Sequence, residues 1–297
     1  ILERGTVLIE AARHELLALL VREGGKTLPD AWAEVREATD YCRYYAQLAR
    51  QQFAAPLPLP GATGEANELR LAGRGVFAAI SPWNFPLAIF VGQITAALAA
   101  GNTVIAKPAR QTPLIGYRAV HLLHQAGIPT QVLHYLPGAG ATLGGHLAVD
   151  ERIAGVVFTG STETAQSINR ALAARSGAIV PFIAETGGQN AMIVDSSALP
   201  EQVVTDALQS AFNSAGQRCS ALRVLFLQDE IADRPIGAGP IEAVRDDSVR
   251  HPEHGAFLHA RIERFGRDER YRVGPFGVAT SLERDHAGRV IDLDDRA

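Results

Sequence analysis

Residues 75–100 read GVFAAISPWNFPLAIFVGQITAALAA, and this stretch decides the fold class. A short β-rich run, 75–80, leads into a loop held by two prolines and then into an apolar run with helical spacing, 87–100. The same alternation continues to about Leu227, with strands predicted at 103–106, 132–136, 153–158, 179–183, 191–194 and 222–227 and helices at 114–126, 163–175 and 200–215. The alternation predicts an α/β fold with a doubly wound parallel sheet that binds ligands at the carboxyl ends of its strands.

The two ends of the chain differ from this central part. Helical spacing predicts helices at 6–23 and from Thr27 to about Gln51, followed by a proline-rich link at 56–64. After about Asp233 the sequence is rich in charged residues with little apolar periodicity, and strands are predicted there only at 271–278 and 289–293. This tail does not read as a continuation of the alternating domain.

Composition excludes several classes of protein. The net charge of −4 and the pI of about 6.2 argue against a nucleic-acid-binding surface, which needs a basic field. Two cysteines, no secretory leader and no apolar stretch of about 18 residues favour a cytoplasmic protein without a transmembrane segment. No metal site is predicted. The chain begins at Ile1 without an initiator methionine, so we expect its natural start to lie further upstream.

Two residues in small-residue frames suggest covalent catalysis. Cys219 follows Gly216-Gln217-Arg218, which disfavours apolar burial, and Glu185 precedes Thr186-Gly187-Gly188, where the backbone can approach a ligand closely. A thiol nucleophile and a carboxylate base suit attack on a carbonyl followed by activation of water. The alternatives are a helix cap for Glu185 and a buried inert thiol for Cys219, a state that we do expect for Cys42.

The loop Ser81-Pro82-Trp83-Asn84-Phe85-Pro86 follows the first strand of the alternating region. Its two prolines hold the backbone, so the Asn84 amide can serve as a preorganised donor to an oxyanion. The alternative is an asparagine that stabilises a turn. The position after a strand favours the functional interpretation.

Three more strand ends carry residues suited to a dinucleotide. Lys107 could reach a ribose hydroxyl or a phosphate, although it could also be a solvated lysine. Gly160 and Ser161 lie between a strand and a helix, where backbone donors favour a pyrophosphate, although Ser161 by itself is more typical of a helix N-cap. Gly140 marks another strand end that could border the cofactor.

These pieces, in this order, resemble the aldehyde dehydrogenase superfamily. The runs that carry the resemblance are PWNFP (82–86), FTGSTE (158–163), AETGGQN (184–190) and GQRCS (216–220), and the separation of 34 from Glu185 to Cys219 also matches. Residues 1–233 look most like the 1-pyrroline-5-carboxylate dehydrogenase region of bifunctional proline utilization A. The division implied is a helical segment 1–64, an NAD-binding domain 65–184, the start of a catalytic domain 185–233 and an atypical tail 234–297.

The resemblance implies NAD-dependent oxidation of L-glutamate γ-semialdehyde to L-glutamate in proline catabolism. Cys219 would form a thioester, Asn84 and the Cys219 N–H would hold the oxyanion, and Glu185 would activate water. Lys107 would contact the adenosine ribose and Ser161 the pyrophosphate. Ser220 would hold the substrate carboxylate. The alternative, of equal weight, is that Ser220 is an ordinary loop serine. The further residues implied to border the cofactor are Ser81, Pro82, Trp83, Gly140 and Gly160.

Several departures from the family leave alternatives open. Arg110 stands where a glutamate is usual, so NADP is an alternative to NAD, unless Arg110 simply points to solvent. The family's Glu-x-Phe-Gly-Pro segment and oligomerisation arm are not recognisable, and the sequence after Asp233 looks foreign or out of frame. A catalytically silent remnant that at most binds dinucleotide is therefore the competing hypothesis, and we expect little or no turnover. A cysteine hydrolase would need a histidine partner, and none lies near Cys219 in sequence.

Overall fold

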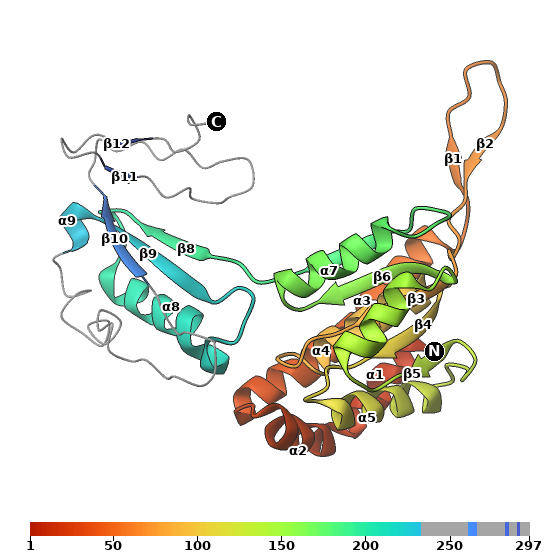
Figure 1. Ribbon diagram of the computed structural model, residues 1–297, viewed down its shortest axis with the longest axis horizontal. Helices are drawn as coiled ribbons and strands as arrows, with labels where there is room; N and C mark the ends of the chain where they lie inside the picture. The colour runs from red at the N-terminus through yellow and green to blue at the C-terminus, as the bar shows by residue number, and fades with distance from the viewer. Residues whose placement is uncertain (233–260, 266–282, 285–289, 292–297) are drawn as a thin grey trace. The chain divides into compact units, whose positions relative to one another are not determined.

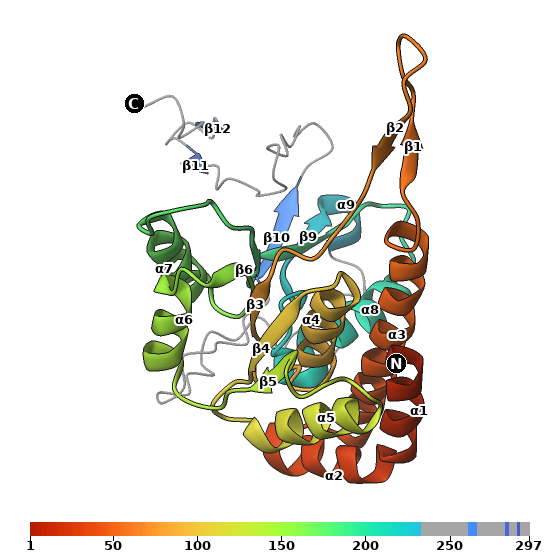
Figure 2. The ribbon, with the colours of Figure 1, turned by 90° about the vertical axis from the view of Figure 1, so that its right-hand side faces the viewer.

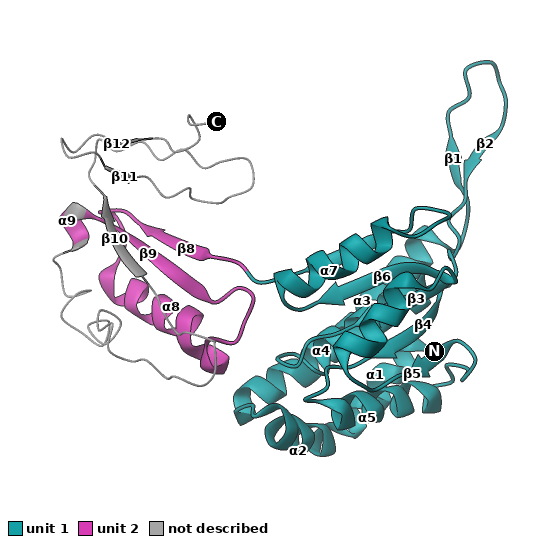
Figure 3. Ribbon diagram, viewed as in Figure 1, with its two compact units in different colours: residues 1–187 teal, residues 188–297 magenta. Residues whose placement is uncertain are grey.

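A computed structural model describes residues 1–232, 261–265, 283–284 and 290–291 (Figure 1). The chain forms two compact units, residues 1–187 and 188–297 (Figure 3), and each is described by itself. Within the described residues, no helix combines the length and apolar character needed to cross a bilayer.

Three helices open the first unit: α1 (Leu2–Ala11), α2 (Arg13–Gly24) and α3 (Leu28–Gln52). The prediction of one helix over 6–23 was wrong, because the chain breaks at Ala12 (φ −84°, ψ 7°). Helix α3 begins as predicted: the Thr27 hydroxyl accepts a hydrogen bond from the Asp30 N–H at 3.3 Å, and a proline stands in the first turn. The capping residue and the proline together fix this helix start from local sequence.

An exposed antiparallel hairpin follows α3. It pairs β1 (Leu57–Leu59) with β2 (Asn67–Leu69), and every residue of both strands is exposed. The link predicted at 56–64 is thus the first arm and the turn of this hairpin, which projects from the first unit (Figures 1 and 2).

A five-stranded parallel sheet forms the centre of the first unit. Its order is β5-β4-β3-β6-β7, which is the doubly wound arrangement, and it confirms the predicted fold class. The strands are β3 (Val76–Ile80), β4 (Thr103–Lys107), β5 (Leu133–Tyr135), β6 (Ile153–Thr159) and β7 (Phe182–Glu185). The connecting helices are α4 (Ala88–Ala99), α5 (Pro113–Gln125), α6 (Gly145–Val149), preceded by a π-helical turn (Gly140–Gly144), and α7 (Thr162–Ala173).

Strands β3, β4 and β6 share their side chains between two cores, as the period of two requires. In β3, Phe77 and Ala79 join the core that holds α1 to α5, whereas Ala78 and Ile80 join the core that holds α6 and α7. The two groups of helices lie on opposite faces of the sheet (Figure 2). Burial on both faces explains why the strands read as continuous apolar runs rather than as alternating ones.

The second unit is a smaller parallel βαβ arrangement. It comprises β8 (Asn190–Val194), α8 (Pro200–Phe212), a 3₁₀ turn (Asn213–Gly216), β9 (Leu222–Gln228) and α9 (Asp229–Ala232), and β10 (Arg261–Phe265) pairs with β9. The strands predicted at 191–194 and 222–227 belong to this second sheet, which the alternating pattern by itself did not separate from the first. The division implied by the resemblance placed residues 185–233 in another domain.

The C-terminal region retains only short described strands. Two of them, β11 (Glu283–Arg284) and β12 (Val290–Ile291), pair antiparallel, and β12 lies inside the predicted strand 289–293. The strand predicted at 271–278 lies outside the described residues.

Candidate active site

The carboxyl edge of the five-stranded sheet collects most of the predicted site residues. In the order β4-β3-β6-β7, these strands end at Lys107, Ile80, Thr159 and Glu185. The register pairs Ile80 with Lys107 on one side and with Phe158 on the other, and pairs Thr159 with Glu185. The winding reverses between β3 and β6, and ligands of doubly wound sheets bind at such a point.

The Asn84 loop leaves this edge directly from β3. The Ser81 N–H donates to the Lys107 carbonyl at 3.1 Å, so the strand pairing extends into the loop. Ser81 and Pro82 are buried, Asn84 is half-buried and Trp83 is exposed. The Ser81 hydroxyl is buried without a hydrogen-bond partner in the described structure, so a ligand acceptor or donor at this edge would satisfy it.

A buried ion pair holds the far end of the Asn84 loop. Lys26 Nζ lies 2.9 Å from Glu34 Oε2, with both side chains almost fully buried, and 4.4 Å from the centre of the Phe85 ring. Glu34 Oε1 accepts hydrogen bonds from the N–H groups of Leu87 (2.7 Å) and Ala88 (3.2 Å) at the start of α4. Burial raises the pKa of Glu34, opposed by Lys26 and by the two N–H donors.

Sequence reasoning missed this pair, which we call the Lys26–Glu34 lock. One signal was available, because Lys26 is one of only two lysines in the chain. The partner could not be found from sequence, since Glu34 looks like any polar residue of an amphipathic helix and bonds to a backbone 53 positions away.

Lys107, the other lysine, is buried at the end of β4. Its ammonium donates to the Pro108 carbonyl at 3.1 Å, and within the described residues it has no ion pair. Burial lowers its pKa. A buried cation at the ligand edge is a natural partner for a ribose or phosphate oxygen. Arg110 is exposed.

Gly160 and Ser161 have local structural roles at the start of α7. The Ser161 hydroxyl accepts from the Thr164 N–H at 3.2 Å, so Ser161 is the N-cap. A Cβ on Gly160 would lie 2.5 Å from the Phe158 ring, which explains the glycine by packing. Helix N-termini of this kind present backbone N–H groups that can bind an anion.

Gly140 and Glu185 are both exposed. Gly140 begins the π-helical turn after β5, the edge strand, and a Cβ there would meet nothing within 4 Å. Glu185 is the last residue of β7, and its carbonyl accepts from the Gly160 N–H at 3.1 Å. The backbone of Glu185 therefore joins the Gly160 loop at the sheet edge.

Cys219 lies in the second unit on the turn between the 3₁₀ segment and β9. Cys219 and Ser220 are both exposed. In the preceding 3₁₀ segment, Ser214 (φ 55°) and Ala215 (φ 53°) adopt left-handed conformations. This backbone conformation costs about 1–2 kcal/mol for a residue with a Cβ. By contrast Cys42 is buried, and burial raises the pKa of its thiol to about 11, as expected for an inert cysteine.

The predicted residues thus fall into two groups. Asn84, Lys107, Ser161 and Glu185 belong to the sheet edge of the first unit, and Cys219 belongs to the second. The residues of the first group and Cys219 therefore belong to different compact units. Within the described residues, no group of three or more His, Cys, Asp or Glu side chains is placed to hold a metal ion.

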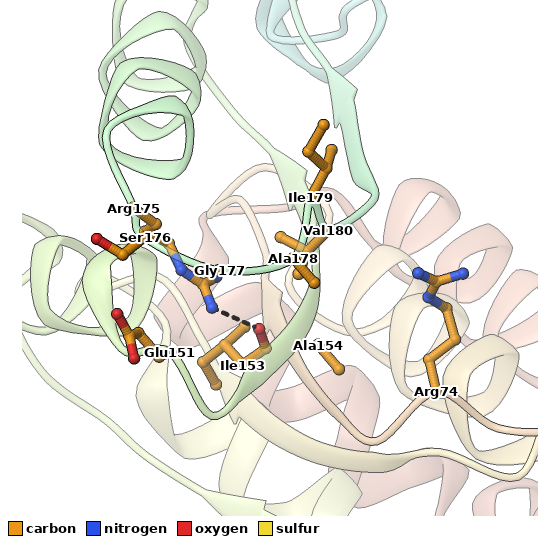
Figure 4. A pocket seen from close by; sticks show the side chains of 10 residues that line it. All are labelled: Arg74, Glu151, Ile153, Ala154, Arg175, Ser176, Gly177, Ala178, Ile179 and Val180. Atoms are coloured by element: carbon orange, nitrogen blue, oxygen red, sulfur yellow. Dashed lines mark hydrogen bonds between the residues drawn. The ribbon is translucent and has the colours of Figure 1, made fainter.

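A cavity of about 420 Å³ lies elsewhere in the first unit, at the amino ends of β3, β6 and β7 (Figure 4). Arg175 donates to the Ile153 carbonyl at 3.1 Å there, and its Nε and Nη1 are buried without partners in the described structure. Because parallel strands separate this edge from the carboxyl edge, the cavity is distinct from the candidate active site. Its lining comprises Arg74, Glu151, Ile153, Ala154 and residues 175–180.

Comparison with known proteins defines the class. The profile of the aldehyde dehydrogenase family matches residues 1–259, and the chain belongs to this family. The match continues past Asp233, so the expectation that foreign sequence begins there was wrong for residues 234–259.

Within this family, the chain is similar to proteins named for proline utilization and for 1-pyrroline-5-carboxylate dehydrogenase activity. Bifunctional protein PutA of Escherichia coli is 56% identical over 239 residues, covering 80% of this chain and 17% of that protein. A crystal structure of Bradyrhizobium japonicum proline utilization A (mutant D779W) is 62% identical with a TM-score of 0.76, covering 78% of this chain and 24% of the other. A Thermus 1-pyrroline-5-carboxylate dehydrogenase with bound NAD is 36% identical with a TM-score of 0.77, covering 82% and 48%. The chain therefore spans a minor part of the PutA proteins and about half of the Thermus enzyme.

Proposed function

We propose that this chain carries the nucleophile and the dinucleotide-binding edge of an NAD-dependent dehydrogenase that oxidises L-glutamate γ-semialdehyde to L-glutamate in proline catabolism. The observation that carries the proposal is the convergence of the Asn84 loop, Lys107, the start of α7 and Glu185 on one sheet edge, in a chain that also exposes Cys219. The similarity to PutA and 1-pyrroline-5-carboxylate dehydrogenases supports the substrate.

In this proposal the Cys219 thiolate attacks the aldehyde carbon. The resulting oxyanion accepts hydrogen bonds from the Asn84 amide and the Cys219 N–H, and each such donor is typically worth about 10²–10³ in rate. Lys107 and the first turn of α7 would hold NAD, which would supply the acceptor for the hydride that the carbon loses, and a thioester to Cys219 would remain. Glu185 then takes a proton from the attacking water, the carbon–sulfur bond breaks, and Cys219 leaves as thiolate. Ser220 contacts the substrate carboxylate.

The residues present fit a dinucleotide. The Ser81 hydroxyl is unsatisfied in the described structure, Lys107 is a buried cation, and the first turn of α7 offers backbone donors for the pyrophosphate. Pro82, Trp83, Gly140 and Gly160 complete the proposed cofactor edge. NAD is the proposed cofactor, and NADP is the alternative that Arg110 raises. A titration with both dinucleotides, repeated with Arg110→Glu, tests this choice: loss of NADP binding alone in the variant would support the role of Arg110.

The proposed function and the silent-remnant alternative differ in whether the purified chain forms an acyl adduct and NADH. The test combines three measurements on the purified chain: NAD binding by calorimetry, NADH formation by absorbance with L-glutamate γ-semialdehyde, and mass spectrometry of Cys219 after exposure to NAD and aldehyde. An acyl adduct or NADH, absent in Cys219→Ala, supports the dehydrogenase.

Two results separate the alternatives. NAD binding that Lys107→Ala weakens, without adduct or NADH, supports the silent remnant and argues against catalysis by this chain. Absence of NAD binding altogether would overturn the proposed cofactor edge.

A further inference from the structure

Asn190 bonds to the main chain on both sides of Ser220. Its side-chain Nδ2 donates to the Cys219 carbonyl at 2.7 Å and to the Ala221 carbonyl at 3.0 Å. Asn190 is the first residue of β8, beside β9, and a shift in the strand register follows it. One side chain thus spans the segment that carries the exposed thiol.

A primary amide suits this position. An NH₂ group offers two donors to two carbonyls, whereas an aspartate of the same shape would place acceptors against acceptors. Space is provided for it as well, because a Cβ on Gly188 would lie 3.2 Å from the Asn190 Oδ1 atom. Within the AETGGQN run, Asn190 is therefore explained by its contact with the Cys219 turn, and Gly188 by the space that the Asn190 side chain needs.

Other hydrogen bonds hold neighbouring positions of the turn. The Ala221 N–H donates to the Arg218 carbonyl at 3.2 Å, and Arg223 Nη2 donates to the Gly216 carbonyl at 2.9 Å. Arg223 thus holds the turn before Cys219, while Asn190 holds the carbonyl of Cys219 itself and the exit into β9.

We propose that Asn190 is a positioning residue for the nucleophile: by fixing the peptide that follows Cys219, it sets the direction of the thiol. This inference rests on the proposed function in taking Cys219 as the nucleophile. Asn190 would act on the reaction only through Cys219. Its hydrogen bonds connect the Cys219 turn to β8, the strand that follows Glu185 in sequence.

The test uses the full chain and three variants: Asn190→Asp, Asn190→Ala and, as matched control, Gln209→Glu. The control makes the same amide-to-acid change on an exposed residue of α8 in the same unit. Alkylation of Cys219 by iodoacetamide is followed by peptide mass spectrometry, with buried Cys42 as the internal reference. Hydrogen exchange of residues 217–221 is compared with that of α8 and β9.

We expect the amides of 217–221 to exchange about tenfold faster in Asn190→Ala and faster still in Asn190→Asp, with α8 and β9 unchanged. At about pH 7.5, Asn190→Asp should also slow alkylation about tenfold, because a nearby carboxylate disfavours the thiolate. Gln209→Glu should match the unchanged chain in both measurements.

Equal exchange in Asn190→Asp and Gln209→Glu would overturn the proposal. Faster exchange spread over α8 and β9 would overturn it too, since Asn190 would then serve the stability of the unit. A localised change in a chain that forms no adduct with aldehyde and NAD supports the positioning role while the proposed dehydrogenase fails, so the two failures are distinguishable.

Discussion

The loop around Asn84 ends against the buried Lys26–Glu34 lock, whereas the turn around Cys219 is exposed and is held by hydrogen bonds from Asn190 and Arg223. The lock fixes the backbone from a hydrophobic interior, where an unpaired charge is strongly unfavourable. The Cys219 turn lies near water, where each hydrogen bond contributes about 0.5–1.5 kcal/mol.

The difference matches the two proposed tasks. An oxyanion donor is effective when it needs no reorganisation at the moment of reaction, so a rigid buried support suits Asn84. A nucleophile must be reached by the substrate, and its exposed turn needs direction more than burial. We infer that the buried ion pair mainly stabilises the loop that carries Asn84, whereas the hydrogen bonds around Cys219 mainly orient its turn.

The largest expected effect comes from breaking the lock. Glu34→Gln leaves Lys26 buried without a counter-charge and should lower the free energy of unfolding of the first unit by about 3–5 kcal/mol. Urea unfolding followed by tryptophan fluorescence measures this unit specifically, because both tryptophans of the chain, Trp32 and Trp83, lie in it.

Two controls accompany this variant. Glu68→Gln removes an exposed partner of Arg70 and should leave the unfolding midpoint nearly unchanged. The double variant Lys26→Met/Glu34→Gln removes the stranded charge while keeping an acceptor for α4, so it should recover most of the loss. A loss below about 1 kcal/mol in Glu34→Gln would contradict the idea that the buried pair supports the loop.

An intermediate effect is expected from Cys42 at alkaline pH. Burial raises its pKa from 9.0 to about 11, so the folded chain retains the thiol proton after the unfolded chain has lost it. This contribution is fully present below pH 9.0 and is lost as the pH rises toward about 11, by about 3 kcal/mol in all. Cys42→Ala should remove this part of the pH dependence.

The measurement is the difference in unfolding free energy between the two proteins across that range. Lys107, whose pKa burial lowers, contributes with the opposite sign in both proteins and cancels in the difference. Parallel stability curves for the two proteins would show that Cys42 is not buried as a neutral thiol.

The smallest effect is a gain in the second unit. Ala215→Gly relieves a positive φ angle and should stabilise this unit by about 0.5–1 kcal/mol. The same change at Ala211, inside α8, should destabilise it by about 1 kcal/mol. Hydrogen exchange of the most protected β9 amides reports both changes, and a loss of protection in Ala215→Gly would refute strain at this turn.

Sequence periodicity predicted the central architecture well, because a strand buried on both faces and an amphipathic helix differ in length and spacing. It also placed Asn84, Lys107 and Ser161 at strand ends, which a parallel sheet must bring to one edge. Periodicity could not show to which sheet a strand belongs. Residues 191–194 have the same apolar pattern as the strands of the first sheet, yet they pair in a second sheet.

Local sequence by itself determined the start of α3, where Thr27 and Pro29 supply the cap and the first turn, and the start of α7, where Ser161 caps. Helices α4 and α5 have no side-chain cap of their own. Their free N–H groups are satisfied by Glu34 and Glu23, the latter accepting from Leu114 and Ile115 at 2.8 and 2.9 Å across 91 and 92 positions.

Only the tertiary structure decided these long-range caps, the lock and the Asn190 contact. The reason is physical: a backbone donor must be satisfied when buried, but any acceptor that the fold brings within reach can satisfy it. Periodicity records which face of an element is apolar, and it carries no record of which distant carboxylate or amide will meet a given backbone group.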